Sequence, residues 1–272
     1  MTADFHALHQ EGTFLLVNVH DAGTATLAEA AGAVAVGTTS SGHAYSIGRR
    51  DAEGALSKGE AISRAAEICA AVDIPVSVDA ENGWGHTPED VSATIAELAD
   101  IGAAGASIED WSGDASIGFY ERELALERVV AAIETARSLD RPFVICARAE
   151  TLLHPHAHDD SIPPLEEALA RLQSFAEAGA DCMYAPGIRD IDTFGRVVVE
   201  AGGPVNALLG VGGPITMDDA RRIGVRRVSV GGSLYRATMA AFQQHVRQLL
   251  ETGSFVVEPP PIPDAVISDL FP

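Results

Sequence analysis

Short apolar stretches alternate with longer amphipathic stretches along the whole chain. The apolar stretches are rich in valine, isoleucine and alanine and lack a clean alternation of polar and apolar residues, which is typical of strands covered on both faces. They fall at residues 14–19, 34–37, 75–79, 106–110, 142–148, 180–186, 204–210 and 226–232. Each is followed by a stretch of helical character, so the pattern predicts eight strand-then-helix units.

The predicted helices cover residues 23–32, 58–72, 88–102, 121–139, 163–179, 189–202, 216–224 and 234–253. Glycine ends many of them, because it most readily adopts the left-handed conformation that stops a helix: Gly32, Gly102, Gly179, Gly202 and Gly224. Eight such units in 272 residues predict an α/β fold, a single (β/α)8 TIM barrel over residues 1–272. An open doubly wound sheet is the alternative, but no Gly-x-Gly-x-x-Gly follows the first strand. Residues 253–272 form a proline-rich tail.

Composition narrows the class of protein further. With 39 acidic and 18 basic residues, the formal net charge is −21, which disfavours nucleic acid and anionic membranes as partners. The apolar runs are too short to span a bilayer, and the first residues lack a signal core, so we expect a cytoplasmic protein. Cys69, Cys146 and Cys182 are far apart in apolar stretches, and we expect them to be reduced core residues.

Polar residues gather where the predicted strands end. In a barrel these ends converge on the face that carries the active site. The residues in question are Asn18, Asp21, Thr39, Ser40, Ser41, Asp79, Glu81, Glu109, Asp110, Arg148, Glu150, Tyr184, Asn206, Gly231 and Gly232. The sequence therefore predicts a mouth lined by several carboxylates and one arginine.

Three of these acids, Asp79, Glu81 and Glu109, follow neighbouring strands. Carboxylates packed so closely repel one another unless a cation is present, and hard oxygen ligands favour Mg²⁺, or Mn²⁺, over zinc. The structural alternative is that each acid caps a helix or lies in a solvated turn, and Asp110 in particular would support neighbouring site residues or cap a helix.

Two further groups have both a structural and a functional interpretation. Arg148 either forms an ion pair with Glu150 or Glu109, or clamps the carboxylate of a substrate. Residues 39–41, followed by Gly42, form either a plain turn or a carboxylate-binding nest. The histidines at positions 154, 156 and 158 belong either to a mobile polar lid or, less favourably, to a metal site.

An ordered set of motifs resembles the isocitrate lyase/phosphoenolpyruvate mutase superfamily, and within it the carboxyvinyl-carboxyphosphonate phosphorylmutase-like branch. The motifs are NVHDAGTATLAEAAG, TTSSGHAYSIGRRD, VDAENGWG, ASIEDW and CARAE, and the resemblance extends from about residue 15 to residue 235. It implies subunits that assemble as dimers or tetramers and exchange their last helix. The helix and proline-rich tail after Tyr235 are compatible with that arrangement.

The resemblance also implies site residues, position by position. Asp79, Glu81 and Glu109 would hold Mg²⁺ directly or through water. Thr39, Ser40 and Ser41 would bind the α-carboxylate of a 2-keto or 2-hydroxy acid. Asp51 would face the reacting end of the substrate, Arg148 would neutralise its charge, and Asn206 would line the pocket.

The loop after the fourth predicted strand departs from the superfamily pattern. It reads DWSGDASIGFYERE and has no cysteine, lysine or histidine, which argues against an isocitrate lyase. The lysine and asparagine that the mutase and phosphonopyruvate hydrolase branch uses there are also absent from it. Glu81 stands where the superfamily usually has a second aspartate.

These features together predict a Mg²⁺-dependent lyase or decarboxylase that acts on a small 2-keto or 2-hydroxy dicarboxylic acid, such as oxaloacetate or a substituted malate, through an enolpyruvate-type species. Asp51, Tyr45 and His43 are the candidate general bases. Three alternatives remain: a phosphonopyruvate-type C–P bond enzyme, a non-catalytic 2-keto acid binding protein, and a phosphosugar isomerase or aldolase. The last would use the glycines at 210–213, 231 and 232 to bind phosphate.

Overall fold

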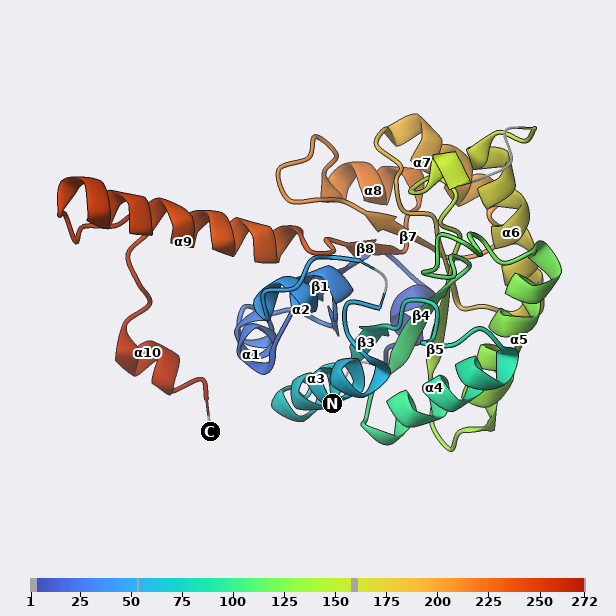
Figure 1. Cartoon of the computed structure of the whole chain (residues 1–272), viewed down its shortest axis with the longest axis horizontal. Coiled ribbons are helices and arrows are strands. Elements are labelled where there is room, and N and C mark those ends of the chain that lie inside the picture. The colour runs from blue at the N-terminus through green and yellow to red at the C-terminus, as the bar shows by residue number, and fades with distance from the viewer. Residues whose placement is uncertain (1–3, 53, 158–160, 272) are drawn as a thin grey trace.

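The computed structural model describes residues 4–52, 54–157 and 161–271. Eight parallel strands form a closed barrel in sequence order, with β8 paired to β1 (Figure 1). The strands are β1 (Phe14–Asn18), β2 (Val36–Gly37), β3 (Val76–Asp79), β4 (Gly105–Glu109), β5 (Val144–Arg148), β6 (Cys182–Tyr184), β7 (Val205–Leu208) and β8 (Arg227–Ser229). The predicted (β/α)8 barrel is therefore confirmed.

Seven helices pack around this barrel: α1 (Ala22–Ala30), α3 (Lys58–Ala71), α4 (Pro88–Asp100), α5 (Arg122–Ser138), α6 (Pro164–Ala178), α7 (Ile191–Glu200) and α8 (Met217–Ile223). Several begin with a side chain that caps the free backbone N–H groups of the first turn. In α3, for example, Ser57 accepts from the backbone of Glu60, and Glu60 accepts in return from Ser57. The five glycines that we expected to stop helices all have positive φ angles, as predicted.

Four short elements were not predicted: α2 (Ser40–Ser46), α10 (Asp264–Ser268) and the 3-10 helices η1 (Ala7–His9) and η2 (Pro155–Ala157). They lack the apolar periodicity of the longer helices. In α2 the residues are SSGHAYS, a composition that favours turns over helices in isolation. Helix α2 depends on contacts at its first turn, which are described below.

The hydrophobic core lies mainly between the strands and the outer helices. Ile95 and Leu98 of α4, Val129 of α5, and Leu172 and Phe175 of α6 are buried there. A separate cluster that includes Phe5 and Phe14 closes the amino-terminal end of the barrel. Such barrels are usually filled by layers of large aliphatic side chains. Here the interior on the carboxyl side of the Phe5 and Phe14 cluster is lined by many polar side chains instead.

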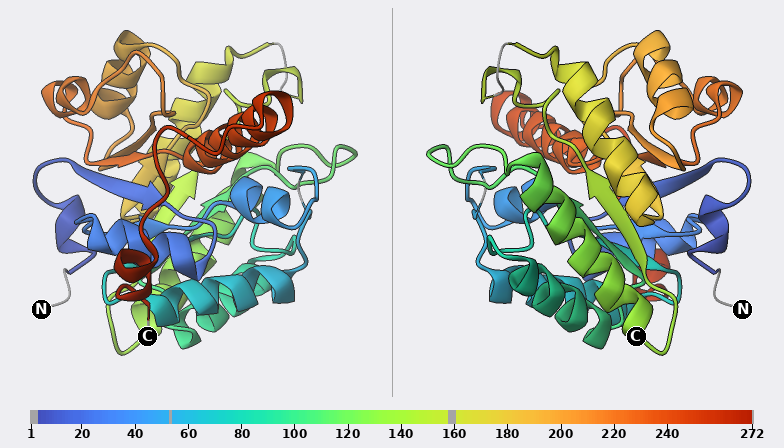
Figure 2. Two further views of the ribbon diagram at one scale, coloured as in Figure 1. Left: turned by 90° about the vertical axis from the view of Figure 1, so that its left-hand side faces the viewer. Right: turned by 90° about the vertical axis from the view of Figure 1, so that its right-hand side faces the viewer.

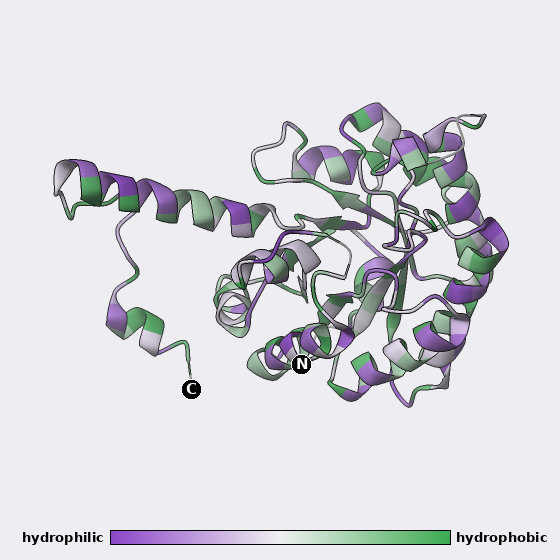
Figure 3. Ribbon diagram, viewed as in Figure 1, coloured by the Kyte–Doolittle hydropathy of each residue, from purple (hydrophilic) through white to green (hydrophobic). Residues whose placement is uncertain are grey.

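The last long helix, α9 (Ser233–Thr252), projects away from the barrel instead of covering it (Figures 1 and 2). Only Ser233 and Tyr235, at its root, are buried. Apolar side chains beyond them are exposed, including Phe242 at 64% and Leu250 at 81%, and Figure 3 shows apolar and polar positions mixed along this arm. The chain then returns through α10. No helix within the described ranges is both long enough and apolar enough to cross a membrane.

Candidate active site

A cavity of about 650 Å³ opens at the carboxyl ends of the strands. All eight strands contribute to its lining, and the nine residues predicted to hold the metal ion or the substrate lie in it: Thr39, Ser40, Ser41, Asp51, Asp79, Glu81, Glu109, Arg148 and Asn206. Its size suits a small organic ligand. Convergence of the strand ends thus brings together residues that are far apart in the sequence.

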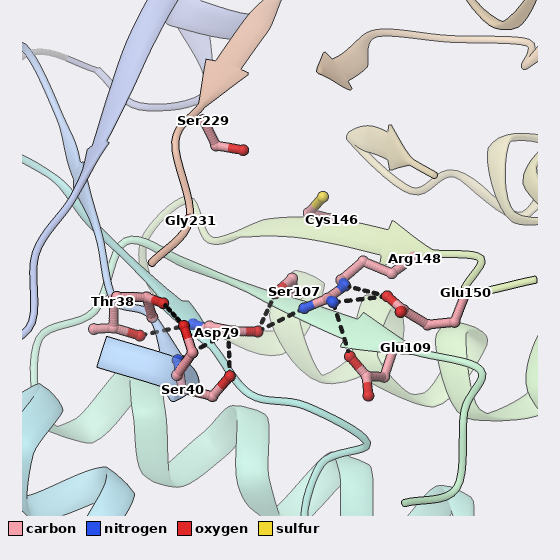
Figure 4. A network of polar contacts seen from close by, with 12 residues as sticks. Thr38, Ser40, Asp79, Ser107, Glu109, Cys146, Arg148, Glu150, Ser229 and Gly231 are labelled. Carbon is pink, nitrogen blue, oxygen red and sulfur yellow. Dashed lines mark hydrogen bonds and ion pairs between the residues drawn. The ribbon is translucent and has the colours of Figure 1, made fainter. Parts of the chain in front are cut away.

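Arg148, at the end of β5, lies at the centre of the charged part of this cavity (Figure 4). Its guanidinium donates to Oδ1 of Asp79 at 2.7 Å and to Oε1 of Glu150 at 2.7 Å, and Nη2 lies 3.2 Å from Oε2 of Glu109. The ion-pair interpretation of Arg148 is therefore correct for both suggested partners, and Asp79 is a third. Arg148 also lines the cavity, so a ligand in the cavity could contact it in addition to these three carboxylates.

Burial and charge shift the protonation of this cluster. Burial alone would lower the pKa of Arg148, but Glu150, Glu109 and Asp79 raise it well above its usual value. Burial raises the pKa of the Glu109 carboxyl well above its usual value; Arg148 opposes this shift, and the charges of Glu150, Asp79 and Glu81 add to it. One guanidinium thus neutralises the surrounding carboxylates incompletely.

Asp79 organises the part of the site that follows β2. Its Oδ2 accepts from the backbone N–H and the hydroxyl of Ser40 at 3.1 and 3.0 Å. The backbone N–H of Asp79 donates to Thr38 Oγ1 at 2.9 Å. Thr39 caps α2. The turn or nest expected at residues 39–41 is therefore the first turn of a short helix, and Asp79 already occupies the N–H group of Ser40.

Asp79, Glu81 and Glu109 have the donor chemistry of a magnesium site, since all three are hard oxygen donors that line one cavity. Glu81 adopts a φ of 48°, a left-handed conformation that non-glycine residues rarely adopt and that often marks functional sites. No three histidine, cysteine or acidic side chains within the described chain converge closely enough to hold an ion together. The residues fit an ion that keeps several water ligands, which is usual for Mg²⁺.

Two predicted bases, His43 and Tyr45, do not lie among the cavity-lining residues of the described chain. His43 is a buried residue of α2, and burial lowers its pKa to about 4. Tyr45 stacks on Tyr235 at the root of α9, with 6.1 Å between ring centroids. Both side chains point away because α2 is a helix, so successive residues after Ser41 turn to different sides.

His154 lines the cavity, although the sequence assigned it only to a polar lid or metal cluster. Its ring stacks on Trp111 at 4.4 Å between centroids, and its Nε2 lies 3.9 Å from Oε2 of Glu150. Trp111 belongs to the loop after β4 and His154 to the loop after β5, so the stacking joins these two loops at the cavity wall. His156 is exposed, and His158 lies outside the described residues.

Asp110 holds the backbone that carries Glu150. Its Oδ1 accepts from the Glu150 N–H at 2.8 Å, and its Oδ2 lies 3.3 Å from Nη1 of Arg171. Burial raises the pKa of Asp110 to about 7 despite that arginine. The supporting role expected for Asp110 agrees with these contacts.

Arg227 of β8 was not predicted from the sequence, yet it lines the deep part of the cavity. Its Nη2 lies 2.6 Å from Sγ of Cys146, and its Nε donates to Oδ1 of Asn206 at 2.9 Å. Burial would raise the pKa of Cys146, but a hydrogen bond with Cys182 and the charges of Arg227 and Arg148 lower it to about 7. Cys146 is a buried core residue beside Cys182 and Tyr184, as predicted, and its sulfur also contacts the Arg227 guanidinium, which the sequence did not indicate.

The turn after β8 offers fewer free N–H groups to a phosphate than its glycines suggest. Asn18 Oδ1 accepts from the backbone N–H groups of Val230 and Gly231 at 2.9 and 2.8 Å. This occupation argues against the phosphosugar alternative. The fold and the charged cavity instead define a (β/α)8-barrel protein whose site suits a small organic anion.

Comparison with known proteins places the chain more narrowly. The family model described as phosphoenolpyruvate phosphomutase matches residues 5–250, so the chain belongs to this family, in the isocitrate lyase/phosphoenolpyruvate mutase superfamily. The resemblance inferred from the motifs is thereby confirmed. A crystal structure from Burkholderia cenocepacia, assigned only to the broad class lyase/mutase, superimposes with a TM-score of 0.90 at 40% identity and covers 98% of this chain and 93% of that one.

Curated relatives span different activities. An uncharacterized protein of Mycobacterium tuberculosis is 33% identical over 87% of this chain and 85% of its own length. The 2-methylisocitrate lyase of Salmonella typhimurium is 29% identical over 91% of this chain and 84% of its own length. The oxaloacetate decarboxylase of Pseudomonas entomophila is 30% identical over 67% of this chain and 61% of its own length. The relatives therefore support an enzyme without fixing its reaction.

Proposed function

We propose that this protein is a Mg²⁺-dependent carbon–carbon lyase or decarboxylase for a small 2-keto or 2-hydroxy dicarboxylic acid of the oxaloacetate type. The observation that carries the proposal is the position of Arg148, a partly buried guanidinium that lines the cavity among Asp79, Glu109 and Glu150. Such a cation is preorganised to stabilise negative charge that develops on a bound acid. The relationship to 2-methylisocitrate lyase and oxaloacetate decarboxylase supports this class of reaction.

The α-carboxylate of the substrate would lie against the hydroxyls at residues 39–41. Thr39 Oγ1 and Ser41 Oγ share a hydrogen bond of 3.0 Å and both residues line the cavity, so the pair would present one remaining hydroxyl hydrogen to an anionic group. Asp51 lines the same cavity and would face the reacting end. Asp79, Glu81 and Glu109 would hold the Mg²⁺ ion, which supplies Lewis-acid polarisation of the 2-keto group when bound.

In oxaloacetate the bond between C3 and C4 would break, and carbon dioxide would leave. The bonding electron pair would move into the C2–C3 bond while negative charge develops on the C2 oxygen, where Arg148 stabilises it. His154 would then give a proton to C3, which produces pyruvate, and would be reprotonated from solvent. Trp111 holds the imidazole by stacking, so the proton donor stays at the cavity wall.

Purified protein should release pyruvate from oxaloacetate in the presence of Mg²⁺ and lose this activity in EDTA. The His154→Gln variant should lose ~10²- to ~10⁴-fold in kcat, the usual contribution of a positioned proton donor. Pyruvate is measured with a coupled dehydrogenase assay, with the non-enzymatic decay of oxaloacetate subtracted.

His156→Gln provides the matched control, because His156 is an exposed residue of the same loop, and it should retain wild-type turnover. Full activity of His154→Gln would remove His154 from the mechanism. Tight binding of oxaloacetate without any product, with metal present, would support the non-catalytic alternative and reject the enzyme.

We further propose that α9 docks on a second copy of this chain, giving a dimer or tetramer in which the last helices are exchanged. Exposed Phe242 and Leu250 lie on an arm that leaves its own barrel, and burying such side chains is favourable by about 1.5–3 kcal/mol each. Light scattering should show a dimer or tetramer, and Phe242→Glu/Leu250→Glu should shift it toward monomer. A wild-type monomer at micromolar concentration would contradict this assembly.

A further inference from the structure

The deep part of the cavity contains a second buried cation, separate from the cluster around Arg148. The side chain of Arg227 comes from the start of β8, and the residue is 3% exposed. No aspartate or glutamate of residues 4–52, 54–157 or 161–271 is recorded in an ion pair with it. Its Nη1 is buried without a hydrogen-bond partner among those residues. A buried guanidinium without a carboxylate partner is energetically unfavourable unless an anion reaches it.

The two cations lie at different depths in the barrel. Cys146 and Arg148 are two residues apart on β5 and face the same side of the strand, a step of about 6.6 Å. Arg227 contacts the sulfur of Cys146, so its guanidinium lies deeper in the barrel than the end of β5 that carries Arg148. A short dicarboxylic acid can extend over a step of this size along the strand, whereas a single carboxylate is smaller.

Small side chains keep the route between the two levels open. Ser77, Ser107 and Ser229 line the cavity from β3, β4 and β8, and Gly37 lines it from β2. Figure 4 shows Ser107 and Ser229 on the cavity side of their strands together with Cys146. Barrels of this type usually fill these layers with valine, isoleucine and leucine. The polar lining therefore suits a ligand that extends into the barrel.

We propose that Arg227, held by Asn206 and Cys146, forms a second anion subsite that takes the far carboxylate of an elongated 2-keto dicarboxylic acid. This inference rests on the proposed function, because it assumes that the near carboxylate and keto group lie at the mouth. Nε and Nη2 of Arg227 are fixed by Asn206 Oδ1 and Cys146 Sγ, so the guanidinium is oriented before a ligand arrives. The subsite selects diacids over 2-keto monoacids of equal length.

Binding of non-cleaved acids to the full-length protein with Mg²⁺, measured by calorimetry, tests the subsite. Wild-type protein should bind 2-oxoglutarate ~10- to ~100-fold more tightly than 2-oxopentanoate, the same chain without the far carboxylate, as expected for a charge-assisted hydrogen bond. Arg227→Gln should remove this preference and leave the affinity for oxalate, which spans only the mouth, unchanged. Arg227→Lys keeps a cation beside Cys146 and should retain part of the preference.

Arg226→Gln is the matched control, because Arg226 precedes Arg227 and its side chain makes an exposed hydrogen bond to the carbonyl of Gly12 at 3.2 Å. Equal wild-type affinity for the two long acids would overturn the subsite, and this measurement requires no variant. If the Arg227→Gln variant binds oxalate and keeps the wild-type preference for the diacid, the subsite is overturned and the proposed function is not. Failure of wild-type protein to bind oxalate and 2-oxoglutarate would overturn the proposed function and the subsite together.

Discussion

Arg148→Gln will reduce turnover of the keto acid by ~10²- to ~10³-fold or more, because it removes the preorganised charge at the site of developing negative charge. The same variant will lose ~3–5 kcal/mol of unfolding free energy, the usual result of removing one partner from a buried ion pair. Asp79, Glu109 and Glu150 would then face one another without the guanidinium that now contacts all three. Urea unfolding and steady-state kinetics on the same preparations measure both effects.

A matched control for this variant is Arg196→Gln. Arg196 also contacts two carboxylates, Glu166 and Glu200, but its side chain is 39% exposed, so its removal should change the unfolding free energy far less than the removal of Arg148. Turnover should not change in the control. Wild-type kinetics in a folded Arg148→Gln protein would show that the site has been assigned wrongly.

Glu109→Gln should have opposite effects on metal-free stability and on metal binding. Because the folded pKa of Glu109 is raised, wild-type stability falls as pH increases from about 4.3 through the folded pKa. Glutamine cannot ionise, so the unfolding free energy of the metal-free variant should exceed that of the wild type near pH 7. Its affinity for Mg²⁺ should fall ~10- to ~100-fold.

Thermal unfolding with and without Mg²⁺ distinguishes these effects. Wild-type protein should gain stability on addition of the metal, and Glu109→Gln should gain little. Glu97→Gln serves as the control, since Glu97 forms an exposed pair with Lys58 at 2.7 Å and should respond to Mg²⁺ as wild type does. Equal stabilisation of Glu109→Gln and wild type by the metal would remove Glu109 from the metal site.

The sequence predicted the barrel and the mouth because both depend on local patterns. Apolar runs mark the strands, and a polar residue at the end of a strand must lie on the carboxyl face once the barrel closes. Asp79, Glu109, Arg148 and Asn206 were found in this way, and each lies in the cavity. The metal trio and substrate roles remain proposals, because convergence in one cavity does not by itself establish ligation.

The residues that the sequence missed reach the cavity by routes that a strand-end rule does not follow. Arg227 is the first residue of its strand, so its side chain reaches the cavity from the amino-terminal side of the barrel. It contacts Cys146, which the sequence placed in an apolar stretch. His154 lies six residues beyond Arg148, and its position depends on stacking against Trp111 of another loop. His43 and Tyr45 do not lie among the described cavity-lining residues, because they belong to a short helix whose first turn is held by contacts such as that of Ser40 with Asp79.

The root of α9 has a further consequence for the pocket. Tyr235 packs against Tyr45 and His20, and a side chain at position 232 would collide with Ser41, so the base of the arm and the hydroxyl-bearing turn are wedged together. A movement of the arm would therefore shift the rim that would receive the acid. The helix that would dock on a neighbouring subunit and the turn that would bind a small anion meet at this one contact.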